Sequence, residues 1–165
     1  MGAGSIIRPP PHNPVRAMFY TMYLDNHPSR QQMQIMLDGL CEPGHIMILN
    51  NSKSLHFATD FFDFSITRGQ FPSESAEYGI RIRSRCTFDL ITETDPDTCI
   101  ENVIAFVGNF ARSMSSDFAL QSNGERLIAI RKYEKILVSS RLHSLGFPFD
   151  KLGIGYDIAE LKELI

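Results

Sequence analysis

The chain has 165 residues, a formal net charge of −3 and 43% hydrophobic residues. This length suits one ordinary domain that buries roughly 70% of its unfolded surface, so no metal or disulfide is needed to hold it together. The composition excludes a disordered or fibrous chain. No apolar run approaches the ~20 residues that span a bilayer, and no secretory signal begins the sequence, so we expect a cytoplasmic protein without membrane contact.

The cysteines predict no special chemistry. Cys41, Cys86 and Cys99 are an odd number without C-x-x-C spacing, which argues against a disulfide framework and against a zinc site. Each lies beside apolar residues, so we expect reduced, buried thiols that pack as small hydrophobic groups. No cofactor and no metal are expected.

The N-terminal region divides into a tail and the start of a domain. Residues 1–16 are rich in proline and poor in apolar side chains, which predicts a mobile tail followed by a single domain over 17–165. Residues 17–24 suit a pleated surface and predict the first strand. A helix follows, with Ser29 as its N-cap and Gln32 as the return partner of a capping box.

Three short strands are predicted next. Residues 45–50 form the second strand, which ends at a polar turn. Residues 55–58 and 61–67 form two more, with a kink near Thr59-Asp60. We therefore expect a kinked strand at an edge of the sheet.

Residues 80–90 show the clearest alternation in the chain, after a predicted loop that contains Gly69 and Pro72. Alternation of apolar and polar residues is typical of a strand with one buried and one solvated face. The predicted core positions are Ile80, Ile82, Ser84, Cys86, Phe88 and Leu90, and the solvated positions are Arg81, Arg83, Arg85, Thr87 and Asp89.

A second helix begins near Thr94-Asp95-Pro96-Asp97, where a capping side chain, a first-turn proline and an acid at the positive end of the helix dipole come together. Apolar residues then recur at helical spacing and predict the face that lies on the sheet. They are Ile100, Val103, Ile104, Val107, Phe110 and Ala111.

Residues 117–140 predict a meander of three antiparallel strands. Asn123-Gly124 is the preferred dipeptide of a two-residue hairpin turn, because both central positions need positive φ. A second short connection lies near Lys132-Tyr133-Glu134.

The remaining chain completes the predicted fold. Residues 142–155 are a predicted loop in which Phe147-Pro148-Phe149 folds back on the core, and residues 157–164 predict a short C-terminal helix. The order of elements favours an α+β two-layer sandwich. In it, a mostly antiparallel sheet carries two main helices on one face.

No catalytic motif is present. The five histidines lie in turns and strand ends without metal-ligand spacing, and no Walker loop, nucleophile elbow or dinucleotide fingerprint occurs. For an enzyme, His56 with Asp60 and Asp63 is the least implausible set. We expect no enzymatic activity.

Charge is concentrated in the middle of the chain, where residues 60–101 hold nine acids and four arginines. Such a stretch repels nucleic acid and attracts basic partners. Aromatic anchors surrounded by charge are typical of binding hot spots, whereas Phe62, Phe64 and Ile66 are expected in the core. The candidate binding residues are Asp60, Phe61, Asp63, Glu93, Asp95, Asp97 and Glu101.

Arg81, Arg83 and Arg85 form a basic stripe on the solvated face of their strand. A phosphate or nucleic-acid site is one interpretation of such a stripe. The favoured interpretation is pairing across strands with the abundant carboxylates.

Residues 78–140 contain a characteristic series of local features. They are the strand Gly79-Ile-Arg-Ile-Arg-Ser-Arg, a helix of about four turns, Asp117-Phe-Ala-Leu, Asn123-Gly124-Glu125, a strand ending in Arg131-Lys132, and Ile136-Leu137-Val138. In this order they resemble immunity proteins encoded beside bacterial polymorphic toxins, in particular the Sit-type immunity family. Phe147-Pro148-Phe149 resembles the segment that often closes those chains.

The resemblance implies a small cytosolic protein without catalysis of its own, which binds one toxin domain and blocks its active site or its access to substrate. The acidic residues would then dock on a toxin whose active-site cleft is basic. A small enzyme with an assembled site and an adaptor domain are the alternatives.

Overall fold

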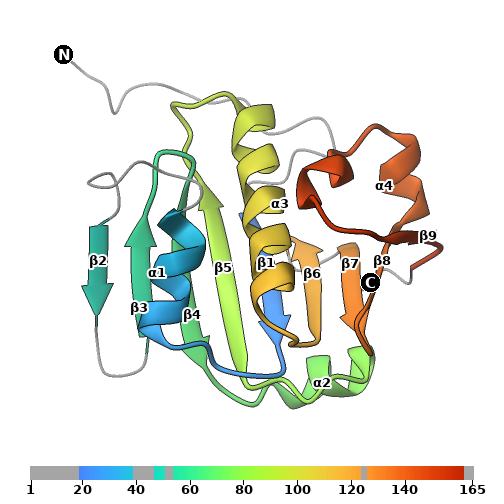
Figure 1. Ribbon diagram of the computed structural model, residues 1–165, viewed down its shortest axis with the longest axis horizontal. Helices are drawn as coiled ribbons and strands as arrows, with labels where there is room; N and C mark the ends of the chain where they lie inside the picture. The colour runs from blue at the N-terminus through green and yellow to red at the C-terminus, as the bar shows by residue number, and fades with distance from the viewer. Residues whose placement is uncertain (1–18, 39–46, 51–53, 124–125, 162–165) are drawn as a thin grey trace.

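The structure is a computed structural model that describes residues 19–38, 47–50, 54–123 and 126–161 (Figure 1). The predicted tail over 1–16 and Cys41 lie outside these residues. Cys86 and Cys99 are free and buried, as predicted, and burial raises the pKa of both thiols.

One sheet of nine strands forms the body of the described chain, in the order β2-β3-β4-β5-β1-β6-β7-β8-β9. All neighbouring strands are antiparallel except β8 and β9, which are parallel. The strands are β1 Phe19–Leu24, β2 Met47–Asn50, β3 Ser54–Ala58, β4 Phe62–Arg68, β5 Ser84–Leu90, β6 Phe118–Ser122, β7 Arg126–Lys132, β8 Lys135–Ser139 and β9 Asp157–Ala159. The helices are α1 Arg30–Asp38, α2 Pro72–Tyr78, α3 Pro96–Ser113 and α4 Ser140–Ser144, with the 3-10 helix η2 over Phe149–Leu152.

Helices α1 and α3 lie on the same face of the sheet (Figure 1), which confirms the predicted α+β arrangement with two main helices on one face. The caps that the sequence predicts are both present. The Gln32 amide N–H donates to Ser29 Oγ at 3.1 Å and the Ser29 amide N–H donates to Gln32 Oε1 at 2.8 Å. At the start of α3, the Thr98 amide N–H donates to Asp95 Oδ2 at 3.1 Å.

The predicted apolar stripe of α3 is buried along its whole length. Phe106 extends this face, and its ring lies 5.2 Å from that of Phe64, 5.4 Å from that of Phe88 and 6.1 Å from that of Phe62. At the C-terminal end of α3, buried Arg131 of β7 donates from Nη1 to the carbonyl oxygens of Ala111 and Met114, at 2.7 and 2.8 Å. A cation at this end also complements the helix dipole.

The meander over β6, β7 and β8 is confirmed, with Ser122 paired with Arg126. Asn123 of the predicted turn has a φ of 51°, and Gly124 lies outside the described residues. The ladder also shifts its register between Leu120 and Gln121. The second connection is a two-residue turn in which Tyr133 and Glu134 have φ of 53° and 67°.

The prediction of a kinked strand at an edge of the sheet is wrong. Strands β3 and β4 form an antiparallel hairpin, and β4 lies inside the sheet between β3 and β5. The expected kink is the tight turn of this hairpin, where Thr59 Oγ1 donates to the Phe62 carbonyl at 2.8 Å and accepts from the Phe62 amide N–H at 3.0 Å. Phe62, Phe64 and Ile66 are fully buried, as predicted.

The predicted loop around Gly69 and Pro72 contains helix α2 instead. Strand β5 begins only at Ser84, and the buried side chains of Ile80 and Ile82 pack with Tyr23 and Tyr78 in a second cluster, separate from the main core. Tyr23 faces the side of the sheet opposite to α3, because its neighbours Met22 and Leu24 belong to the main core. The sheet is therefore partly covered on both faces.

The C-terminal region differs from the predicted loop and final helix. Helix α4 and η2 occupy the predicted loop, and strand β9 stands at the start of the predicted helix over 157–164. Phe147 and Phe149 are buried against the core, as predicted. Pairing with β8 fixes residues 157–159 as a strand, which overrides their helical pattern.

Gly108 gives a direct test of how closely η2 packs on α3. A Cβ atom at this position would lie 1.9 Å from the Leu152 carbonyl oxygen, so Gly108→Ala forces the two helices apart. Helix propensity alone predicts a gain of about 1 kcal/mol. We expect instead a loss of about 1 to 3 kcal/mol in the free energy of unfolding, from overpacking, measured by urea titration. A gain in stability would contradict this close packing.

The turn at Tyr133 and Glu134 gives a second test. Neither residue favours positive φ, whereas Asn-Gly does, so the double substitution Tyr133→Asn and Glu134→Gly relieves strain. We expect the free energy of unfolding to rise by about 1 kcal/mol. The reversed pair, Tyr133→Gly with Glu134→Asn, serves as a control for composition. An equal free energy of unfolding for the two double variants would argue against this turn geometry.

Candidate functional site

Two connections meet at one end of the sheet. The β3–β4 turn contains Asp60 and Phe61, and the β5–α3 connection contains Glu93 and Asp95. The Ile91 amide N–H donates to the Phe61 carbonyl at 3.0 Å, and Thr94 Oγ1 donates to the Asp60 carbonyl at 3.2 Å. These bonds hold the two connections together at the upper end of Figure 1.

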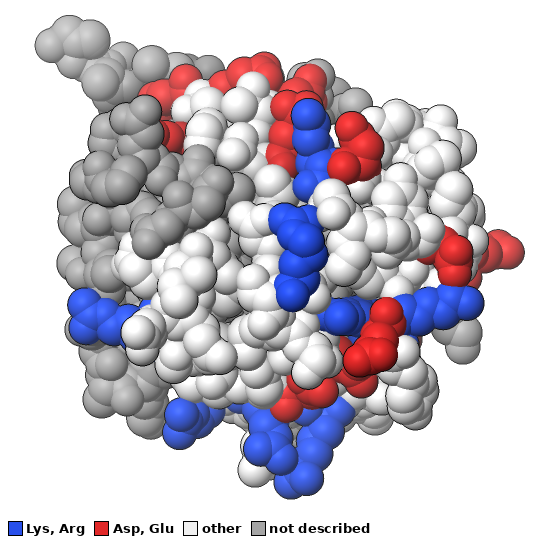
Figure 2. All heavy atoms as spheres, viewed as in Figure 1, with Lys and Arg blue, Asp and Glu red and all other residues white. Residues whose placement is uncertain are grey.

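Five of the seven candidate binding residues gather here, and we call them the acidic end. Figure 2 shows acidic side chains along this side of the molecule. The five residues of the acidic end are exposed except Glu101, which is half-buried one turn into α3. Asp95 also caps the helix, so its carboxylate has a structural role as well. The acidic end consists of Asp60, Glu93, Asp95, Asp97 and Glu101.

The other two candidates lie differently. Phe61 is half-buried and packs against the main core. Asp63 is exposed on the sheet face opposite to α3, directly across from Asp89 of β5. Burial raises the pKa of Asp89, and the negative charge of Asp63 raises it further.

The structure gives little support to an acid–base site around His56. Its Nε2 lies 3.0 Å from Ser54 Oγ, within hydrogen-bonding distance, and the residue across the ladder is Ser65. Asp60 lies at the sheet end and Asp63 pairs with Ala58. No hydrogen bond from His56 to a carboxylate is found within the described part of the chain, which argues against an acid–base site made of His56, Asp60 and Asp63.

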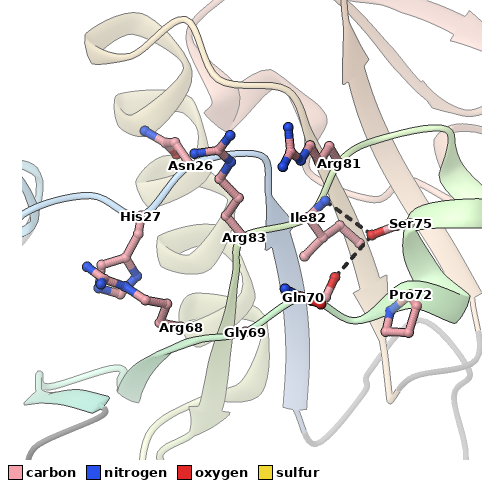
Figure 3. Close-up of a pocket in the computed structure, with 10 residues that line it drawn as sticks. All are labelled: Asn26, His27, Arg68, Gly69, Gln70, Pro72, Ser75, Arg81, Ile82 and Arg83. Atoms are coloured by element: carbon pink, nitrogen blue, oxygen red, sulfur yellow. Dashed lines mark hydrogen bonds between the residues drawn. The ribbon is translucent and has the colours of Figure 1, made fainter.

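A pocket of about 800 Å³ lies at the opposite end of the sheet, and sequence reasoning missed it. Arg81 and Arg83 line it together with Arg68 (Figure 3). The favoured pairing of the arginine stripe with carboxylates is not found among the described residues, and Arg85 instead places its guanidinium 4.9 Å from the ring centre of Phe71. The lining residues are Asn26, His27, Arg68, Gly69, Gln70, Pro72, Ser75, Arg81, Ile82 and Arg83.

Backbone pairing brings these distant residues together. The Arg83 amide N–H donates to the Leu24 carbonyl at 2.8 Å, and the Gly69 amide N–H donates to the Arg83 carbonyl at 3.0 Å. The ends of β1, β4 and β5 therefore meet at the pocket. The stripe that contains Arg81 and Arg83 is a local signal for one wall only, because His27 and Arg68 come from separate segments.

Comparison with protein families matches residues 18–144 to the SitI3-like family. The chain belongs to the SitI3-like family. No curated protein and no solved structure matches it. The family name indicates an immunity protein, in agreement with the resemblance to the Sit-type immunity family.

The matched region of this SitI3-like protein contains both the acidic end and the pocket, whereas η2 and β9 lie beyond it. No helix in the described ranges is long and apolar enough to cross a membrane. Likewise, no group of three potential metal ligands occurs among the residues that the structure describes.

The repulsion between Asp63 and Asp89 leads to a prediction of how the free energy of unfolding depends on pH. The folded-state pKa of Asp89 is raised, so its ionised form destabilises the fold at neutral pH, and this penalty disappears as the pH falls through the folded-state pKa. We therefore expect Asp89→Asn to raise the free energy of unfolding at neutral pH, with a gain that shrinks in acid. Urea titrations at several pH values measure this change.

A double-mutant cycle separates the pair from other effects. Asp63→Asn relieves the same repulsion, so the double variant should gain less than the sum of the single variants at neutral pH. Strictly additive gains would mean that the two carboxylates do not interact.

Proposed function

We propose that this SitI3-like protein is an immunity protein that binds a cognate bacterial toxin domain in the cytoplasm and neutralises it. It blocks the active site of the toxin or its access to substrate. The acidic end carries the proposal, because the structure gathers there five of the acids that the sequence singles out. Asp63, farther along β4, and Phe61, which supports the turn, complete the proposed binding region.

The placement of the acids suits a docking surface. They lie on a turn, a connection and the first turns of a helix, all anchored to the sheet, so little conformational entropy is lost when a partner binds. Several like charges on one exposed end create a field that accelerates association with an oppositely charged partner. The matching surface on the toxin is a basic cleft, such as one that binds an anionic substrate.

Neutralisation itself is tested by co-expressing the protein with the toxin domain encoded beside its gene. We expect growth to be restored and the two proteins to co-purify. The proposed function fails if the adjacent toxin remains active in the presence of the folded protein.

The acidic end is tested with the triple variant Asp60→Asn, Glu93→Gln and Asp97→Asn, which removes charge but keeps the hydrogen-bonding shape. We expect the association rate constant with the toxin to fall by about tenfold at low salt, because steering is lost. Stopped-flow mixing at several salt concentrations measures this rate.

A charge-matched control removes three exposed acids elsewhere, through Glu134→Gln, Asp150→Asn and Glu160→Gln. This control should change the rate by no more than about twofold, because the local field at the acidic end is preserved. Equal losses in both triple variants would show that only net charge matters and that the acidic end is not the docking surface.

A further inference from the structure

The pocket between α2 and the ends of β4 and β5 collects positive charge. Arg68, Arg81 and Arg83 all line it, and no carboxylate is among its described lining residues. Figure 3 shows the three side chains around one hollow, with Arg68 beside His27. This cluster of cations lies in a chain whose net charge is −3.

Two buried polar atoms at the pocket also lack partners. Asn26 Oδ1 and His27 Nδ1 are inaccessible to solvent and have no hydrogen bond among the described residues. Burial lowers the pKa of His27, and the charge of Arg68 lowers it further, so this imidazole is neutral at physiological pH. An unpaired buried polar atom destabilises the protein, and a ligand that supplies the missing hydrogen bond removes this cost.

The walls of the pocket are built before any ligand arrives. Ser75 Oγ of α2 accepts from the Ile82 amide N–H at 3.2 Å and donates to the Gln70 carbonyl at 3.1 Å, as the dashed lines in Figure 3 show. On the other side, Ser84 Oγ donates to the Asn26 carbonyl at 2.5 Å. A site with fixed walls loses little entropy when it binds.

We propose that this pocket binds a small phosphate ester whose organic part carries hydroxyl groups. Guanidinium groups donate paired hydrogen bonds to phosphate oxygens, and three cations suit a dianion better than a single carboxylate. The pocket is far larger than one phosphate group and falls within the ~300 to 1,000 Å³ typical of small-ligand sites. A small rotation of the Asn26 amide exposes Oδ1 to the pocket, where a ligand hydroxyl supplies the donor that this atom lacks.

The same observations argue against a nucleic-acid strand. A polynucleotide needs a continuous cationic track, and log affinity then depends steeply on salt. Here the arginines are confined to one concave site, while the opposite end of the sheet is acidic. The charge distribution therefore fits a compact anion that enters the pocket alone.

The test is isothermal titration calorimetry of the full chain with ribose 5-phosphate and AMP as phosphate esters, at constant ionic strength. Ribose, adenosine and citrate are the reference compounds that lack phosphate. We expect saturable binding of at least one ester with a dissociation constant below about 1 mM, and weaker binding of every reference compound.

The variant Arg81→Gln/Arg83→Gln should weaken this binding by at least about tenfold, because two charge-assisted contacts are lost. Both side chains are exposed, so the fold should persist, which thermal melting checks. The charge-matched control Arg141→Gln/Lys151→Gln, in α4 and η2, should bind within about twofold of the wild type.

The variant Asn26→Ala tests the contact with the ligand hydroxyl. It should lower the affinity for the ester more than the affinity for inorganic pyrophosphate. The proposal is overturned if no ester saturates the protein, if citrate binds as tightly, or if both double variants lose affinity equally. Neutralisation of the toxin by Arg81→Gln/Arg83→Gln should be unchanged, so failure of this site and failure of the immunity role are distinguishable.

Discussion

The contact between α3 and the centre of the sheet is the interaction on which the rest of the structure depends. Phe106 lies among Phe62, Phe64 and Phe88 in edge-to-face and tilted geometries, and each such aromatic pair contributes about 0.5 to 1.5 kcal/mol beyond its burial. This cluster joins α3 to β4 and β5, which are the two strands that connect the acidic end with the pocket. Both candidate surfaces are therefore positioned by the same buried rings.

The order of charges along β4 and β5 explains why one end is acidic and the other basic. Asp60 lies just before β4, and Arg68 is the last residue of this strand. Around β5 the order is reversed, with Arg83 before the strand and Glu93 after it. Because the two strands are antiparallel, this reversal places like charges together at each end of the sheet.

This reversal also shows what the sequence could and could not predict. Local signals with a defined partner a few residues away were sufficient for the caps at Ser29 and Asp95 and for the buried stripe of α3. The acids were likewise identified as a group. The stripe that contains Arg81 and Arg83 was also identified, but its union with Arg68 was not, since that depends on the pairing of β4 with β5.

The errors have a common physical origin in tertiary pairing. The β3–β4 connection looked like a kink because a three-residue turn stabilised by Thr59 carries no Gly or Pro. Residues 157–159 became a strand because β8 offered them a pairing edge. Helix α2, with only seven residues, is too short for a periodic pattern and owes its place to Tyr78, which is buried against the sheet.

The separation of the two ends has a consequence for how each can act. The seven residues of β5 span about 20 Å, since a strand rises roughly 3.3 Å per residue, whereas exposed charges are screened over about 8 Å at physiological salt. The field of the acidic end therefore decays before it reaches the arginines of the pocket. Each end can meet a ligand of opposite sign without weakening the other, so one small sheet can present two independent charged sites.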